Sequence, residues 1–232
     1  MAAVGGGTLR RTAWLASLLV LVCGYGREIA AAAADSSSAT FGYHWLRLDG
    51  EASLPAWYSS VLMLLSALLM LLVSRHGGGS DGRLNRQWAV LGGLFILLSA
   101  DEAVALHEQL SLPLQQLLHT GGPFFFGWVV AGLGAVMLLG LAYLPFLLRV
   151  ARRTAVGLVL AGALYVAGAL GLEMLGGYVY ERFGPSPYYV FITVCEETLE
   201  ILGLTVLFNV MVAHAAAVLP PLRLGGSPPA GP

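Results

Sequence analysis

Charged side chains are scarce in this sequence. Only 11% of its 232 residues are charged, whereas 57% are hydrophobic and the mean hydropathy is +0.77. An ordinary soluble domain carries roughly 25% charged residues, so this composition excludes that class and predicts an integral membrane protein. The formal net charge of −1 decides nothing, because in a membrane protein the side on which each charge lies matters more than the sum.

Cysteines and several catalytic motifs are also scarce or missing. The two cysteines, Cys23 and Cys195, lie within apolar runs, which argues against a disulfide framework. The stretch HEQLS at 107–111 lacks the second histidine of H-E-x-x-H, and there is no Walker or E-x-x-H motif. An intramembrane zinc hydrolase needs several histidines on its helices. Only His107 and His214 are candidates, and they lie near opposite membrane faces.

No nucleic-acid partner is expected; the expected partner is the lipid bilayer.

Long apolar runs are what the sequence does contain. Crossing a hydrocarbon core of about 30 Å takes roughly 20 mostly apolar residues. Six runs qualify and predict an all-α bundle of six transmembrane helices: 13–34, Pro55–Ser74, Gln87–Leu106, Gly127–Leu148, Thr154–Gly176 and Tyr188–Leu219.

Residues 1–34 have two interpretations. Arg10 and Arg11, the apolar stretch after them and the later alanine tract fit a cleaved signal peptide, which would leave five helices. The same residues fit an uncleaved anchor if Arg27 and Glu28 reach the outer interface. The bundle itself is expected to span residues 35–219, and the Gly/Pro-rich tail 220–232 is expected to be a disordered cytoplasmic segment.

The arginines predict the orientation of the bundle. All 12 basic residues are arginine, and six helices place nine of them on one side, in segments 75–86 and 149–153 and near the chain ends. The remaining three are Arg27, Arg47 and Arg182. Short loops rich in arginine face the cytoplasm, so both termini are predicted to be cytoplasmic.

This topology gathers acidic residues at the outer side. Of the 13 acidic residues, only Asp81 is predicted to be cytoplasmic. Seven carboxylates and one histidine fall near one depth, at the end of the third helix, near the end of the fifth and at the start of the sixth. These candidate site residues are Asp101, Glu102, His107, Glu108, Glu173, Glu196, Glu197 and Glu200.

Helical spacing suggests acidic stripes on these helices. In one continuous helix, Asp101 and Glu108 differ in direction by about 20°, and Glu196 and Glu200 are one turn apart. Ser99, one turn before Glu102, is placed to hydrogen-bond it. The alternative is that the acids only cap or solvate helix ends, and Asp49 and Glu51 either join the outer cleft or remain solvated loop charges.

Three outer arginines cannot neutralise this many carboxylates. The excess charge requires shared protons, a bound cation or water. A hard cation such as Ca²⁺, Mg²⁺ or Mn²⁺ suits oxygen ligands, and His107 extends the choice to Zn²⁺ or Fe²⁺. A divalent metal ion is therefore a possible cofactor.

Four stretches carry a family resemblance: LRLDGEASLPAWYSSVLMLLSALL, LLSADEAVALHEQL, GALGLEMLGGY and EETLEILG. In this order they resemble an uncharacterised family of bacterial multi-pass membrane proteins, over about residues 41–212. The resemblance implies a bacterial inner membrane and a retained first helix, but no reaction.

Three functions remain open. The first is binding or passage of a proton or divalent cation in an outer acidic cleft between the third, fifth and sixth helices. The second is a metal-dependent membrane enzyme that acts on a lipid-borne substrate. The third is a structural or assembly subunit, either in a homo-oligomer or with another membrane partner.

Overall fold

The computed structural model describes residues 5–38, 40–50, 52–76 and 82–219. These residues form helices and no strand. The predicted tail 220–232, Glu51 and Asp81 lie outside the described residues. Helices α1 to α8 and three short 3-10 or π segments, η1 to η3, follow in the order α1 (Gly6–Ala33), η1 (His44–Leu46), α2 (Leu54–His76), α3 (Gly82–Val104), α4 (Leu106–Leu118), η2 (Gly122–Phe124), α5 (Trp128–Leu147), α6 (Arg152–Val166), η3 (Ala167–Leu172), α7 (Glu173–Phe183) and α8 (Pro187–Val218).

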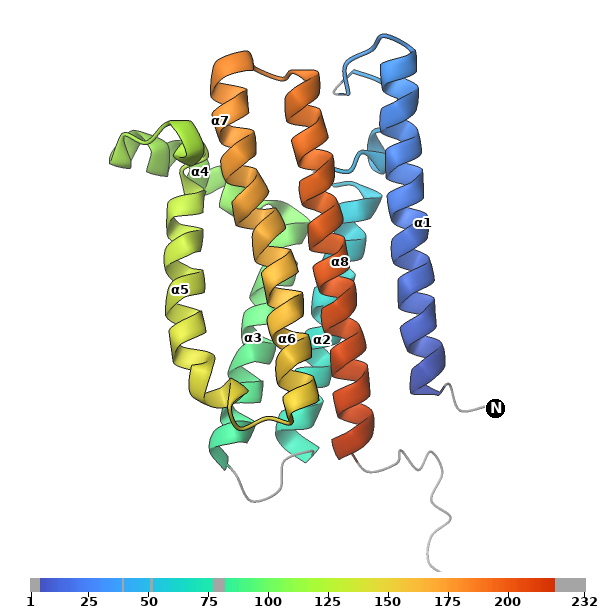
Figure 1. Ribbon diagram of the computed structural model, residues 1–232, viewed down its shortest axis with the longest axis vertical. Helices are drawn as coiled ribbons and strands as arrows, with labels where there is room; N and C mark the ends of the chain where they lie inside the picture. Colours follow the sequence, from blue (N-terminus) through green and yellow to red (C-terminus); the bar gives the residue numbers. More distant parts are fainter. Residues whose placement is uncertain (1–4, 39, 51, 77–81, 220–232) are drawn as a thin grey trace, which may run out of the picture.

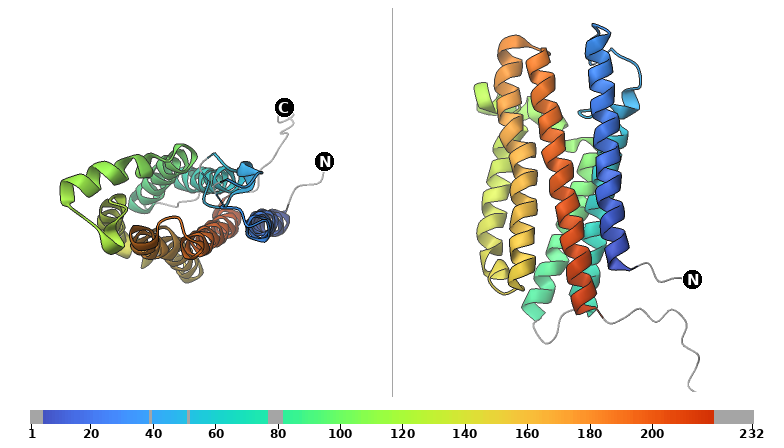
Figure 2. Two further views of the ribbon diagram at one scale, coloured as in Figure 1. Left: turned by 90° about the horizontal axis from the view of Figure 1, so that it is seen from above. Right: turned by 45° about the vertical axis from the view of Figure 1, so that its right-hand side comes forward.

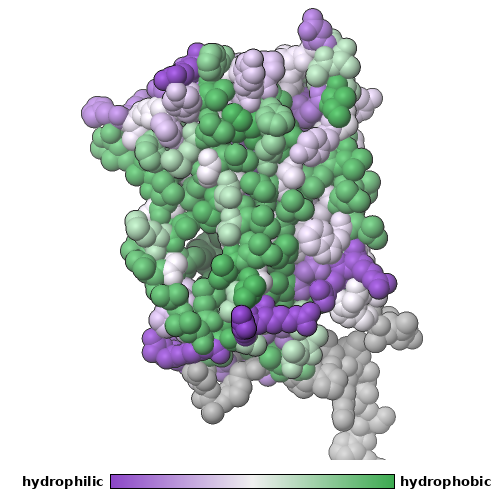
Figure 3. Space-filling model, in the orientation of Figure 1, coloured by the Kyte–Doolittle hydropathy of each residue, from purple (hydrophilic) through white to green (hydrophobic). Residues whose placement is uncertain are grey.

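Six helices of the described chain are long and apolar enough to cross a membrane, as predicted. They are α1, α2, α3, α5, α8 and the continuous helix formed by α6, η3 and α7. They run up and down alternately, so that α1 begins and α8 ends at the same end of the bundle (Figure 1). The space-filling view shows a broad apolar surface between two more polar ends (Figure 3).

The two ends differ in charge. At one end α1 begins, α2 ends, α3 begins and α5 is joined to α6; we call it the arginine end, after Arg10, Arg11, Arg75, Arg83, Arg86, Arg149, Arg152 and Arg153. At the other end α7 and α8 form a hairpin (Figure 1). There Gly184 adopts a positive φ of 64° after α7, and Ser186 caps α8 by accepting a hydrogen bond from the Tyr189 backbone N–H.

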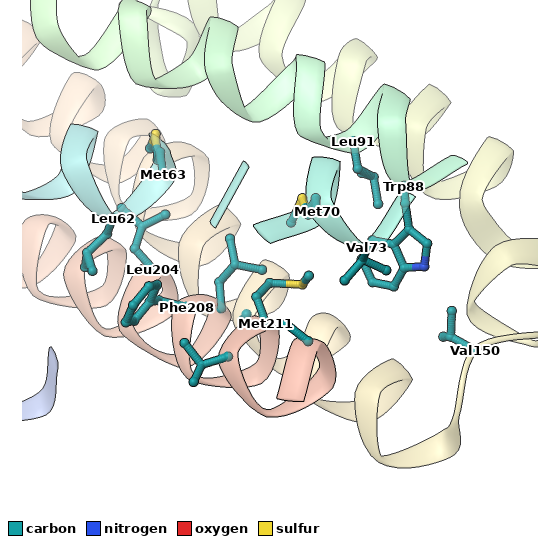
Figure 4. Packing of buried hydrophobic residues seen from close by; sticks show 14 of the residues in the cluster. Leu62, Met63, Met70, Val73, Trp88, Leu91, Val150, Leu204, Phe208 and Met211 are labelled. Atoms are coloured by element: carbon teal, nitrogen blue, oxygen red, sulfur yellow. The ribbon is translucent and has the colours of Figure 1, made fainter. Parts of the chain in front are cut away.

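Helix α8 is the centre of the bundle and contacts α1, α2, α6, η3 and α7. The apolar core lies around its lower half, where Leu204 and Met211 of α8 face Met63 and Met70 of α2 (Figure 4). Next to them Trp88 of α3 is buried. This core holds α2, α3 and α8 together in the half of the bundle near the arginine end.

Helix α1 is joined to the bundle through hydroxyl groups. The Ser17 hydroxyl lies 2.5 Å from the Thr205 hydroxyl of α8 and 2.8 Å from that of Tyr58 of α2. Tyr58 also donates to the carbonyl of Ala13 at 3.0 Å. The buried side of α1 repeats at alternating steps of four and three residues, which is the period of a helix packed along another helix. Its members are Ala13, Ser17, Val20, Gly24, Arg27 and Ala31.

Two predicted boundaries were wrong. The third helix does not reach Leu106: it ends at Val104, and a separate helix, α4, runs roughly perpendicular to the long helices at the edge of the bundle, near the end opposite the arginines (Figures 1 and 2). The fifth does not end at Gly176: α6, η3 and α7 continue to Phe183, so Glu173 lies within the helix. The spacing of leucines in α4, at Leu106, Leu110 and Leu114, is that of a helix with one apolar face.

Candidate functional site

The break between α3 and α4 brings Asp101 and His107 together. Ala105 adopts left-handed backbone angles, φ 49° and ψ 51°, which turn the chain between the two helices. One oxygen of Asp101 accepts a hydrogen bond from the His107 backbone N–H at 2.9 Å, and the other lies 2.8 Å from His107 Nδ1. Asp101 therefore accepts a hydrogen bond from a backbone N–H group that has no partner within the first turn of α4. Its other carboxylate oxygen pairs with the imidazole of His107.

The acidic stripe expected over 101–108 does not form, because the helix is interrupted at Ala105. Asp101 and Glu102 remain on α3, whereas Glu108 lies exposed on α4 and affects His107 through its charge. Ser99 is bonded to Ser60 of α2 instead of Glu102, with the two hydroxyls 2.9 Å apart.

A tryptophan connects this pair to the next helix. The rings of His107 and Trp128 lie 4.7 Å apart, and Trp128 Nε1 donates to Glu173 Oε1 at 3.0 Å. Trp128 begins α5, and Glu173 follows the π-helical segment η3. Irregular π turns of this kind often occur at functional sites. The result is a connected row from Asp101 through His107 and Trp128 to Glu173.

The acids of α8 lie directly beside Glu173. Glu196 and Glu200 are each only 8% exposed, and Glu196 Oε2 is buried without a hydrogen-bond partner among the described residues. The Glu196 carboxyl group is in electrostatic contact with those of Glu173, Glu197 and Glu200.

Glu102 of α3 completes the group through its interaction with Glu200. We call the set the carboxylate cluster; its members are Asp101, Glu102, Glu173, Glu196, Glu197 and Glu200.

The cluster lies at one depth of the bundle. At 1.5 Å per residue, Asp101 lies about 29 Å from the start of α3, Glu173 about 32 Å from the start of α6 and Glu200 about 27 Å from the end of α8. All three helix ends are at the arginine end. The cluster thus lies about one hydrocarbon thickness, roughly 30 Å, from the arginine end.

Nearby arginines are already engaged with other groups. Arg27 pairs with Glu28 and Arg47 with Asp49, at 2.8 and 2.7 Å. The hydrogen bond to Asp49 raises the pKa of Arg47 in spite of its partial burial. Arg182 is exposed and stacks on the ring of Tyr178. Among the described residues, His107 is therefore the basic group in direct contact with the cluster, through Asp101.

The protonation of His107 depends on this contact. Burial favours the neutral imidazole, but the hydrogen bond and the charge of Asp101, aided by Glu108 and Glu102, outweigh it and raise the pKa of His107. The stabilisation from the charged pair is then complete below the pKa of a free histidine, about 6.5, and is lost as the pH rises through the higher folded-state value.

We therefore expect His107→Gln to lower the free energy of unfolding by about 0.5–1.5 kcal/mol at pH 6 and by less above pH 8. Thermal unfolding of the purified protein across this range measures the difference. His44→Gln, which changes an exposed histidine at the same end, is the control and should shift neither curve. An equal loss from His107→Gln at both pH values would contradict the charged pair.

Sequence reasoning missed one partner of the candidate residues and left the role of another open. Trp128 was absent from the expected site, although its position at the start of the fourth predicted helix places it at the same depth as the acids. Asp49, for which two roles were open, pairs with Arg47 and also affects Glu197 through its charge.

The described residues contain no group of three His, Cys, Asp or Glu side chains arranged to hold a metal ion.

Fold and site together define a helical bundle with six helices of membrane-spanning length and a buried carboxylate cluster near one end. The chain belongs to the family described as a domain of unknown function (DUF8692), whose model matches residues 11–215. The match includes α1 from residue 11 onward and every member of the cluster. Comparison with curated proteins and with solved structures gives no match.

Proposed function

We propose that the carboxylate cluster is a proton-binding site of a multi-pass protein in the bacterial inner membrane. The observation that carries this proposal is the unpartnered, buried oxygen of Glu196 next to the carboxyl groups of Glu173 and Glu200. An uncompensated carboxylate in a buried site costs several kcal/mol, and several of them repel one another. Protons shared among the acids remove both costs.

A divalent cation is the second way to neutralise the cluster. It receives less support, because Ca²⁺ takes six to eight oxygen ligands and an open zinc site takes three protein ligands. No such set is assembled among the described residues. Bound protons need only pairs of neighbouring carboxyl groups, which the cluster contains.

Coupling between Glu173 and Glu196 tests the shared site. We expect Glu173→Gln and Glu196→Gln to be non-additive in their effect on the free energy of unfolding, by about 0.5–3 kcal/mol, because each amide changes the number of protons left for the other acid. Glu181→Gln is the matched control, since Glu181 lies on the same helix but accepts its hydrogen bond from the Gly122 backbone N–H. Its combination with Glu196→Gln should be additive within about 0.5 kcal/mol.

Two results would contradict a proton site. One is additive behaviour of Glu173→Gln and Glu196→Gln together with a melting temperature that does not change between about pH 5 and 8. The other is stabilisation by Mn²⁺, Ca²⁺ or Zn²⁺ that both substitutions abolish, which would assign the cluster to a metal ion.

The proposal places the arginine end in the cytoplasm and the carboxylate cluster toward the outside. The nine-to-three division of arginines supports this orientation. We expect a cysteine at His76 to be labelled only from the cytoplasmic side, and one at Gln116 of α4 only from outside, after Cys23 and Cys195 are replaced. Both positions are exposed. The reverse pattern would move the cluster to the cytoplasmic leaflet.

A further inference from the structure

A second feature of the bundle is an apolar cavity on the arginine side of the carboxylate cluster, whose charges reach Tyr165 in its lining. It has a volume of about 190 Å³, and residues of α2, α3, α5, α6 and α8 line it. Apart from the hydroxyls of Tyr143 and Tyr165 its lining is hydrocarbon, and the Tyr143 hydroxyl already donates to the carbonyl of Gln87 at 3.0 Å. Water finds few partners in such a space, and apolar cavities of about 150 Å³ stay dry and take up small hydrocarbons.

The cavity opens sideways rather than toward either end. The space-filling view shows a hollow between α5 and α6 in the half of the bundle near the arginines (Figure 3). Leu139 and Tyr143 of α5 and Leu158 and Gly162 of α6 line this part. A side opening at this depth faces the hydrocarbon of the bilayer.

Exposed arginines lie at the membrane surface below this opening. Arg149, Arg152 and Arg153 occupy the connection between α5 and α6 and the first turn of α6. Gly162 is ten residues beyond Arg152, or about 15 Å along the helix. This distance is half the thickness of a hydrocarbon core of roughly 30 Å. Half the thickness is the depth to which one lipid chain extends from the membrane surface.

We propose that the cavity binds one chain of an anionic phospholipid from the leaflet at the arginine end, with the lipid phosphate at Arg149, Arg152 and Arg153. Arginines near the membrane surface attract anionic lipid. The chain fills the space between α5 and α6 as far as Tyr165. The cavity borders the carboxylate cluster at Tyr165, but the proposed lipid binding does not depend on proton binding in the cluster.

Gly162 allows the cavity to be filled without disturbing its walls. A Cβ atom added at Gly162 meets no atom within 4 Å, so Gly162→Leu places its side chain in open space. Gly140→Leu is the matched control, because Gly140 of α5 is equally unobstructed and exposed but does not line the cavity. Circular dichroism and size-exclusion chromatography establish that both variants fold.

The experiment titrates the delipidated, detergent-purified protein with phosphatidylglycerol and with phosphatidylcholine, and follows bound lipid by native mass spectrometry. We expect the wild type and Gly140→Leu to prefer phosphatidylglycerol, and Gly162→Leu to bind it at least tenfold more weakly. Arg152→Gln with Arg153→Gln should abolish the preference while leaving weak binding of both lipids.

Equal binding of phosphatidylglycerol by Gly162→Leu and Gly140→Leu, or an absence of preference in the wild type, would overturn the proposal. A wild-type dimer that Gly162→Leu dissociates would also overturn it, since a second copy would then fill the cavity.

Discussion

Arg27→Met is expected to lower the free energy of unfolding by about 3–5 kcal/mol, the cost of breaking a buried ion pair from one side. Arg27 is 4% exposed, and its guanidinium donates to Glu28, to the Ser38 hydroxyl and to the backbone carbonyls of Ser38, Phe41 and Gly42. Methionine replaces the stem but none of these donors. The carboxylate and three carbonyls are then left without the partner that holds the segment after α1 against the helix.

Arg182→Met is the control for this prediction. Arg182 is also an arginine at the end opposite the arginine end, but it is exposed and contacts the Tyr178 ring, with its Cζ 4.2 Å from the ring centroid. Its loss should cost about 0.5–1 kcal/mol. Denaturant unfolding of both variants in mixed micelles gives the comparison.

The effect of Arg27→Met also tests whether residues 1–34 are retained. We expect them to be retained as an anchor, because α1 supplies Ser17 to the hydroxyl network and Arg27 to the following segment. If residues 1–34 were removed as a signal peptide, Arg27→Met would leave the stability of the mature protein unchanged.

Gly168→Ala is expected to lower the free energy of unfolding by about 1–3 kcal/mol, the usual cost of overpacking. A Cβ atom at Gly168 would lie 2.8 Å from the Glu196 carbonyl oxygen and 2.9 Å from Cγ of Glu200. One contact is backbone, so η3 and α8 must move apart. This movement would also separate Glu173 from Glu196 and weaken their coupling.

Gly171→Ala is the matched control within the same π-helical segment. The nearest atom to its added Cβ, the Val166 carbonyl oxygen, is 4.0 Å away, so alanine fits. We expect stability to be unchanged or increased by up to about 1 kcal/mol, since alanine favours helices over glycine. Similar stability of the two alanine variants in thermal unfolding would contradict the close approach of η3 and α8.

The membrane-length helices could be predicted because each is defined by a local property. An apolar run such as Gly127–Leu148 needs no knowledge of its neighbours, and α5 occupies Trp128–Leu147. The end of α3 could not be predicted in this way. The residues around Ala105 are good helix formers, with neither glycine nor proline to signal the left-handed turn.

The candidate site depended on contacts between distant residues. Topology indicated that Glu173, Glu196 and Glu200 would reach one depth, but the bond from Trp128 to Glu173 joins residues 45 positions apart. Similarly, the close approach of Gly168 to Glu196 follows from packing of η3 on α8. Helical phase within one segment contains no information on either contact.

Proton binding by the carboxylate cluster can be measured by infrared spectroscopy of the purified protein. A protonated carboxyl group has a C=O stretching band distinct from the bands of a carboxylate. We expect such a band at pH 7, a shift on exchange into deuterated water, and a loss of intensity in Glu196→Gln but not in Glu181→Gln. A spectrum at pH 7 without a protonated carboxyl band, or with one that Glu196→Gln leaves unchanged, would contradict a shared-proton cluster at Glu196.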